Sequence, residues 1–227
     1  MQLIQTEKRH SKHNKVMESI FPFIVIFALS FLIMTVTFAF SSATLNLPLF
    51  KSYFKGGWLL LMNFIPIFML MTFTYLVSNR LWVGYALTGF LFVLMSLINK
   101  FKLMYRDDPF QFIDIKLFKE SLMMTRRYSL RLSPRIILLI IGLIAVAVVL
   151  KIFFNRFRIN SWKIRVALLA IAIIAGVFIF NDFYFNSKIY NEVGDKTLIN
   201  IWVQSEQFQS KGFVYPFIYS IKDAKER

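Results

Sequence analysis

The 227-residue chain contains no cysteine and few acidic residues, with 12 Asp and Glu against 27 Lys and Arg. Without cysteine, no disulfide, thiolate nucleophile or thiolate metal ligand can form. Charged residues make up 17% of the sequence, whereas they make up about a quarter of a typical soluble domain. This deficit excludes an ordinary soluble domain, and the 57% hydrophobic content predicts an integral membrane protein.

The chain carries a formal net charge of +15 and a pI near 10.1. In a soluble chain, this excess of positive charge would suggest nucleic acid as the partner. Here the basic residues stand at the ends of long apolar runs, where anionic membrane lipid is the nearer partner. We therefore expect anionic lipid and no nucleic acid among its partners.

Apolar runs separated by polar segments predict an all-α integral membrane fold with five transmembrane helices. The second run contains Asn63 and Pro66, which suggests a kink whose freed backbone groups need a neighbouring helix. Only Ser78, Asn79 and Arg80 separate the second and third runs, so these helices should form an antiparallel hairpin. The predicted spans of this membrane domain, residues 19–180, are 19–40, 58–77, 81–99, 135–150 and 166–180.

The distribution of Lys and Arg predicts the orientation, because short cytoplasmic loops are enriched in these residues. The basic tail at 1–18 and the acid-free loop at 151–165 both favour the cytoplasm. The segment at 100–135 opposes this assignment, since it carries nine basic residues of its own. Giving weight to the tail and the short loop, we expect a multi-pass protein of the cell membrane with a cytoplasmic N-terminus and an extracellular C-terminus.

The long polar interruption at 101–134 divides the spans into two groups. Asp108 is predicted to be a helix N-cap, with Pro109 at the first helical position and Gln111 completing a capping box. From 113 to 128, apolar residues fall on one helical face and most of the basic residues on the other. This pattern predicts an amphipathic helix lying in the membrane interface, and a solvated loop is the alternative.

Six charged residues of this segment are candidates for contacts with lipid headgroups or with another domain. Guanidinium groups pair with phosphate in bidentate fashion, and carboxylates accept hydrogen bonds from glycerol hydroxyls. The alternative is that the acids only cap a helix or face water and that the arginines only reach for the membrane surface. The candidates are Arg106, Asp107, Asp108, Asp114, Arg126 and Arg127.

The last 47 residues, 181–227, are aromatic and polar, and their apolar residues are too sparse to span a membrane. They predict an extracellular juxtamembrane linker that packs along the headgroups or against another domain. Its candidate interfacial aromatic residues are Trp202, Phe213, Tyr215, Phe217 and Tyr219.

Two stretches, QSKGFVYPFIYSIKD at 209–223 and DDPFQFIDIKLFKES at 107–121, together with IWVQSEQ at 201–207, resemble the lipoteichoic acid synthase family of Gram-positive bacteria. The resemblance implies five transmembrane helices followed by an extracellular, sulfatase-like catalytic domain. In that domain a threonine nucleophile and manganese transfer glycerol phosphate from phosphatidylglycerol to a glycolipid-anchored polymer in cell-wall assembly. By this comparison the chain holds the membrane part and the start of the linker, and no catalytic or metal-binding residue can be carried over.

The sequence leaves a second function open, that of a stand-alone polytopic membrane regulator or assembly partner without catalytic activity. A channel or transporter is disfavoured, because such proteins usually place ionisable residues inside their spans and the predicted runs have no interior charge. In the first reading the chain anchors and positions its own catalytic domain and presents lipid to it. In both readings residues 1–227 alone are expected to lack transferase activity.

Overall fold

The computed structural model describes residues 2–116, 133–155, 157–159, 161–194, 197–200 and 202–226. All regular secondary structure in these residues is helical. The long elements are α1 (Gln2–Ala39), α3 (Gly57–Ser78), α4 (Leu81–Arg106), α7 (Pro134–Phe153) and α8 (Trp162–Ile179), which continues as the π-helix η1 (Phe180–Tyr184).

Five stretches of these helices are long and apolar enough to cross a membrane. They are Ile20–Ala39, Gly57–Ser78, Leu81–Arg106, Pro134–Phe153 and Trp162–Tyr184. The prediction of an all-helical protein with five spans is therefore confirmed. The ends differ from those predicted, since α4 continues past residue 99 to Arg106 and α8 begins before residue 166, at Trp162.

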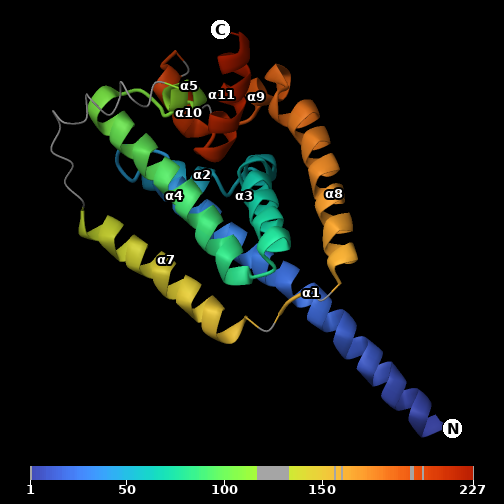
Figure 1. Ribbon diagram of the computed structural model, residues 1–227. Coiled ribbons are helices and arrows are strands. Elements are labelled where there is room, and N and C mark those ends of the chain that lie inside the picture. Colours follow the sequence, from blue (N-terminus) through green and yellow to red (C-terminus); the bar gives the residue numbers. More distant parts are fainter. Residues whose placement is uncertain are drawn as a thin grey trace.

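Three helices form the centre of the bundle, and two lie outside it (Figure 1). Helices α1, α3 and α4 pack against one another, whereas α7 packs on α4 and α8 packs on α3. In the most apolar 18-residue stretch of each span, the buried share is between 33% and 44% for the three central helices. It is 11% for α7 and 6% for α8. Most of the surface of α7 and α8 therefore meets lipid when the bundle is in a bilayer.

The predicted hairpin of α3 and α4 is present, and small residues bring its helices together. Asn79, with φ 54°, ends α3 in the left-handed conformation and allows the chain to reverse at once. A Cβ on Gly84 would lie 3.3 Å from the backbone N of Tyr75, so the two backbones approach closely at this glycine.

The short helices of the described residues gather at one end of the bundle (Figure 1). We call this the capped end. The opposite end, which we call the loop end, holds the turn at 78–80 and the connection between α7 and α8. The short helices are α2 (Leu47–Ser52), α5 (Phe112–Lys116), α9 (Ser187–Glu192), α10 (Gln204–Ser210) and α11 (Val214–Glu226).

One continuous hydrophobic core joins the spans to the C-terminal helices. It extends from Ile26 in α1 through Ile67 in α3 to Tyr215 and Ile218 in α11. The segment that the sequence predicts to be a linker thus forms helices that pack into the capped end. Of its five candidate aromatic residues, only Trp202 points outward, with 88% of its surface exposed.

Candidate functional site

The candidate site is the capped end, where the predicted charged residues meet the C-terminal helices. Arg106, at the end of α4, is exposed, and Asp107 follows it as the left-handed C-cap residue with φ 49°. The Oδ1 atom of Asp107 accepts a hydrogen bond of 3.2 Å from Ser205 Oγ in α10. Arg126 and Arg127, and most of the predicted interfacial helix, lie outside the described residues.

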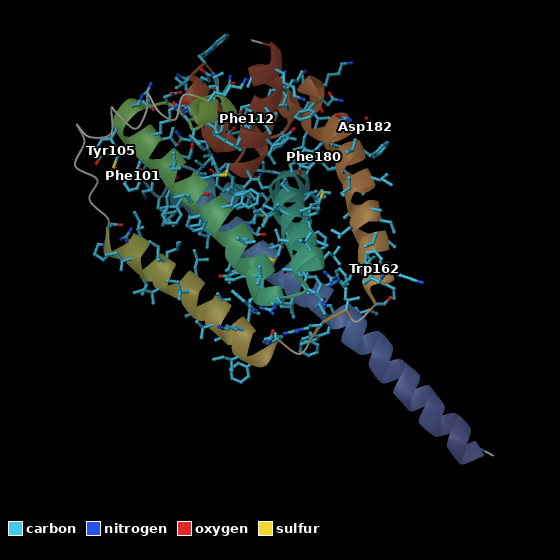
Figure 2. The ribbon with its side chains drawn as sticks, viewed as in Figure 1. Phe101, Tyr105, Phe112, Trp162, Phe180 and Asp182 are labelled. Carbon is cyan, nitrogen blue, oxygen red and sulfur yellow. The ribbon has the colours of Figure 1, made fainter. Side chains whose placement is uncertain are left out.

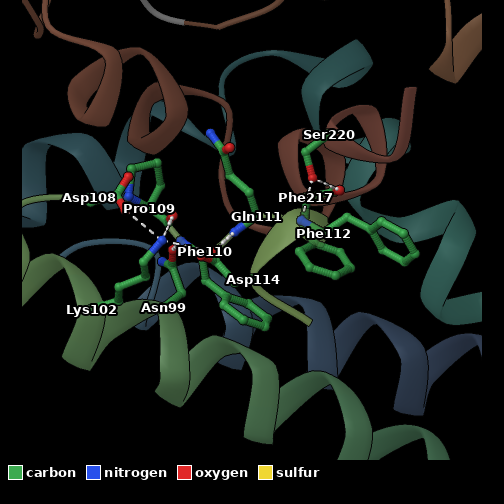
Figure 3. Close-up of polar contacts among 10 residues, drawn as sticks. All are labelled: Asn99, Lys102, Asp108, Pro109, Phe110, Gln111, Phe112, Asp114, Phe217 and Ser220. Carbon is green, nitrogen blue, oxygen red and sulfur yellow. Dashed lines mark hydrogen bonds and ion pairs between the residues drawn. The ribbon is translucent and has the colours of Figure 1, made fainter. Parts of the chain in front are cut away.

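Lys102 draws two of the predicted carboxylates together (Figure 3). Its Nζ atom lies 2.6 Å from Asp108 Oδ2 and 2.8 Å from Asp114 Oδ2, and it also donates to the carbonyl of Pro109 at 2.9 Å. The side chains of Lys102 and Asp114 are 12% and 16% exposed, and that of Asp108 is 42% exposed. These carboxylates therefore hold the loop after α4 on the helix, and only Asp108 keeps a substantial exposed surface.

The prediction that Asp108 caps a helix beginning at Pro109 is wrong. Residues 108–111 are not helical, and α5 begins at Phe112. Asp114, in the first turn of α5, accepts a 2.7 Å hydrogen bond from the backbone N–H of Gln111. Asp114 thus supplies the carboxylate half of a capping box. The physical reason is that the Asp108 carboxylate binds the Lys102 ammonium group on α4 and is therefore not engaged in capping a helix.

Asn99 ties the same loop to the centre of the bundle. Its Nδ2 atom donates to the carbonyl of Ser41 at 3.3 Å, and its Oδ1 atom accepts from the backbone N–H of Phe110 at 2.9 Å. The Phe110 ring is buried and stacks on Phe217 of α11, with 5.4 Å between ring centroids. A single amide side chain thus positions the aromatic residue on which α11 rests.

Helix α5 is docked on α11 through backbone-directed hydrogen bonds (Figure 3). Ser220 Oγ accepts from the backbone N–H of Phe112 at 2.9 Å and donates to the carbonyl of Phe217 at 2.6 Å. Lys116 Nζ donates to the carbonyl of Ala224 at 3.2 Å. Helices α5 and α11 therefore form one unit, although the bonded residues lie 108 positions apart in the sequence.

The start of α11 is held inside the membrane bundle by Asn63 of α3. The buried Asn63 side chain accepts from the backbone N–H of Tyr215 at 3.1 Å and donates to the carbonyls of Lys211 at 2.9 Å and Leu59 at 3.0 Å. Gly212 lies beside it with φ +78°, and a Cβ there would come within 2.8 Å of Asn63 Oδ1. Only glycine fits this conformation and this space without strain.

Tyrosines complete the attachment of the C-terminal helices. The hydroxyl of Tyr53 donates to the carbonyl of Gln209 at 2.6 Å. Burial raises the pKa of Tyr53, against the opposing hydrogen bond from Ser41, so the hydroxyl keeps the proton that it donates. Tyr190 stacks on Tyr219 with 3.7 Å between centroids, and burial also raises the pKa of Tyr190. Both tyrosines thus act as neutral side chains.

The backbone group that Pro66 frees in α3 has its partner at this end of the molecule. Because proline has no N–H, the carbonyl of Met62 loses its usual partner four residues later. The hydroxyl of Tyr184, in η1, donates to that carbonyl at 2.7 Å. The expectation that a neighbouring helix satisfies the freed backbone group is therefore confirmed.

A groove of about 800 Å³ with both apolar and charged lining residues opens beside this core, between the start of α3 and α9. Its lining includes Lys55, Trp58 and Glu192. In the described part of the chain, no three acidic, histidine or cysteine side chains lie close enough to hold a metal ion. The manganese implied by the resemblance therefore has no ligand set among these residues.

The capped end can hold segments in place and can meet lipid headgroups, because most of its buried polar groups, with the exception of the Tyr215 hydroxyl, bind other parts of the protein while Arg106 and the groove beside Lys55 remain accessible. Sequence reasoning missed Lys102, Asn99 and Gly212 as organising residues. Sequence reasoning did single out Asn63, as an amide inside an apolar run, and the acids Asp107, Asp108 and Asp114. Comparisons with protein-family models, curated proteins and solved structures find no match to this chain.

Proposed function

We propose that this chain is the membrane domain of a lipoteichoic acid synthase-like glycerophosphotransferase. Such an enzyme polymerises glycerol phosphate from phosphatidylglycerol on a glycolipid anchor. In this role the chain anchors the extracellular catalytic domain, sets its position and presents lipid to it. The nucleophile and the manganese belong to that domain, and the residues described here perform no step of the transfer.

The observation that carries the proposal is the attachment of the segment at 209–223. This segment bears the family resemblance, and it is also the part that Asn63 and Tyr53 bind into the end of the bundle. A catalytic domain that takes its substrate from a bilayer must be held at a defined height and orientation, because misplacement of reacting groups is costly. Because α11 is bound to the bundle by these hydrogen bonds, it can hold a catalytic domain at a fixed height and orientation.

The proposal requires the capped end to face the outside of the cell. Because the chain contains no cysteine, a single introduced cysteine gives an unambiguous accessibility signal. Trp202→Cys lies at the capped end, and Arg158→Cys lies at the loop end. We expect a membrane-impermeant thiol reagent to label the first variant in intact cells and the second only after permeabilisation. The reverse pattern would contradict the orientation.

Activity provides the decisive test. The protein encoded by the complete reading frame should release diacylglycerol from phosphatidylglycerol in a manganese-dependent reaction, whereas purified residues 1–227 should release none. Gly212→Val, which unseats α11, should reduce turnover of lipid substrate in membranes much more than hydrolysis of a water-soluble phosphodiester. A complete protein without metal-dependent turnover would overturn the proposal and favour the stand-alone regulator.

A further inference from the structure

A second groove lies lower on the same side of the bundle, along the seam between α3 and α8. It has a volume of about 430 Å³, and its lining is apolar except near Asn181 at the top. One wall is formed by Pro66, Met69 and Phe73 of α3, and the other includes Gly176 of α8. Because both walls belong to membrane-spanning segments, the medium that surrounds the groove is hydrocarbon.

Gly176 is the buried residue of α8, and it lines the groove opposite α3. A Cβ on Gly176 would lie 2.8 Å from the terminal methyl carbon of Met69. Toward the capped end, η1 contacts α3, where Tyr184 binds the Met62 carbonyl and Trp58 packs on Phe183 with 5.9 Å between centroids. In Figure 2, Phe180 lies near the capped end of α8 and Trp162 at its opposite end. Phe180 is part of the groove lining.

We propose that the seam between α3 and α8 binds one membrane phospholipid, with an acyl chain in the lower, apolar groove and the headgroup in the upper groove, where Lys55 and Glu192 are part of the lining. The proposal rests on the five spans and not on the proposed enzyme. Eight helical residues separate Trp58 from Pro66, about 12 Å along the axis. This is less than half of a hydrocarbon core about 30 Å thick, so one lipid can reach both grooves.

Charge and residue type in the upper groove fit a phospholipid headgroup. Lys55 supplies an ammonium group for the phosphate, and Trp58 is the kind of residue that settles at the level of the headgroups. Glu192, on the same groove, can accept hydrogen bonds from an amine or hydroxyl of the headgroup. The pairing of one cation with one anion favours a headgroup that carries both a phosphate and a hydrogen-bond donor.

Native mass spectrometry of the purified chain in mild detergent tests the proposal. The probe is a dioleoyl phospholipid with an ethanolamine headgroup, because the net charge of +15 would attract any anionic lipid non-specifically. We expect the wild-type protein to retain one copy. Gly176→Leu should weaken retention about tenfold, since a side chain in the groove removes on the order of ten dispersion contacts with the acyl chain.

Gly142→Leu is the matched control, because a Cβ on this α7 glycine would meet nothing within 4 Å. It should leave lipid retention unchanged. Ala172→Leu, on the same wall as Gly176, is a second groove-filling variant in case Gly176→Leu does not fold. Equal retention by the folded groove variants and Gly142→Leu would overturn the acyl-chain site.

The headgroup half has its own test. Lys55→Gln should weaken binding of the phospholipid by severalfold and leave binding of dioleoylglycerol, which has the same chains and no phosphate, unchanged. If Lys55→Gln weakens the binding of both lipids equally, Lys55 does not bind the headgroup. These measurements involve no turnover, so a negative result here is distinct from a failure of the enzymatic proposal.

Discussion

The capped end and the loop end of this bundle satisfy their polar groups in different ways. At the capped end, the buried amides of Asn63 and Asn99 bind backbone groups that lie up to 152 residues away in sequence. At the loop end, the side chain of Asn79 exchanges hydrogen bonds of 3.2 and 2.9 Å with the backbone of Ile159. Arg165 donates to the carbonyls of Leu76 and Val77, which are left without partners at the end of α3.

The difference lies in burial. Asn63 and Asn99 are fully buried, whereas Asn79 and Arg165 are only partly so. A buried polar group whose partner is removed pays the full cost of desolvation, while a partly exposed one can turn to water. The capped end should therefore be far more sensitive to single substitutions than the loop end. Equilibrium unfolding in mixed micelles, followed by circular dichroism, measures this difference.

Asn63→Leu should cause the largest loss. It leaves the N–H of Tyr215 and the carbonyl of Lys211 buried without their partner, at about 1–3 kcal/mol for each group. We expect the free energy of unfolding to fall by about 4 kcal/mol by the same principle. Leu61→Ala, on the exposed face of α3, is the control and should change stability little. Equal effects of the two substitutions would mean that α11 is not held by Asn63.

Gly212→Ala should cost about 3 kcal/mol, because it combines strain at positive φ with overpacking against Asn63 and Phe38. The control is Gly57→Ala at the start of α3, where a Cβ would meet nothing within 4 Å. That change should be neutral or slightly stabilising, since alanine reduces the entropy of the unfolded chain. If Gly212→Ala is as stable as Gly57→Ala, steric conflict does not explain why this turn has a glycine.

The sequence was sufficient to predict the spans but not the cap. Long apolar runs are a local signal of membrane insertion, and Pro66 by itself implies a carbonyl in need of a partner. The C-terminal segment gave no such signal, because its apolar residues are too sparse to span. Its burial depends on Asn63 and Tyr53, which lie about 150 residues away from it and share no periodic pattern with it.

The candidate site shows the same limit. Asp107, Asp108 and Asp114 were predicted as candidates for contacts with lipid headgroups or with another domain, and the structure gives all three a partner within the described residues. Lys102 is the partner of Asp108 and Asp114, because α4 continues beyond the apolar run and places this lysine next to the loop. A helix end set by an ion pair cannot be located from hydropathy, which only reports where the apolar residues stop.

Lys102→Met tests how much the ion pairs contribute to the capped end. Methionine preserves the apolar stem and removes the charge, which leaves Asp114 largely buried and Asp108 partly exposed without a cation. Unpairing a buried ion pair costs about 3–5 kcal/mol, but the exposure of Asp108 reduces this. We expect a loss of about 2 kcal/mol by these principles. Adding Asp114→Asn should restore part of it, and a double variant less stable than the single one would contradict the ion-pair account.

Tyr184→Phe tests the compensation of the proline. It removes the donor to the Met62 carbonyl and should cost about 1.5 kcal/mol. In a Pro66→Ala background the residue at position 66 regains an N–H that can bind the same carbonyl, so the loss of the tyrosine hydroxyl should cost much less. The double-mutant cycle reports the coupling directly. Equal costs in the two backgrounds would show that Tyr184 does not act through this carbonyl.

Substitutions at the loop end should cause the smallest loss of stability. At Asn79, the contribution of the side-chain hydrogen bonds can be separated from that of the left-handed backbone conformation. Asn79→Gly keeps the left-handed conformation accessible and removes both hydrogen bonds to Ile159. Because the site is only partly buried, water can replace these bonds, and we expect a loss of about 0.5–1 kcal/mol. Asn79→Ala removes the same bonds and adds the cost of a non-glycine residue at φ 54°, about 1 kcal/mol more. If Asn79→Gly instead destabilises the protein as much as Asn63→Leu, burial does not govern the difference between the two ends, and the loop end must be as tightly specified as the cap.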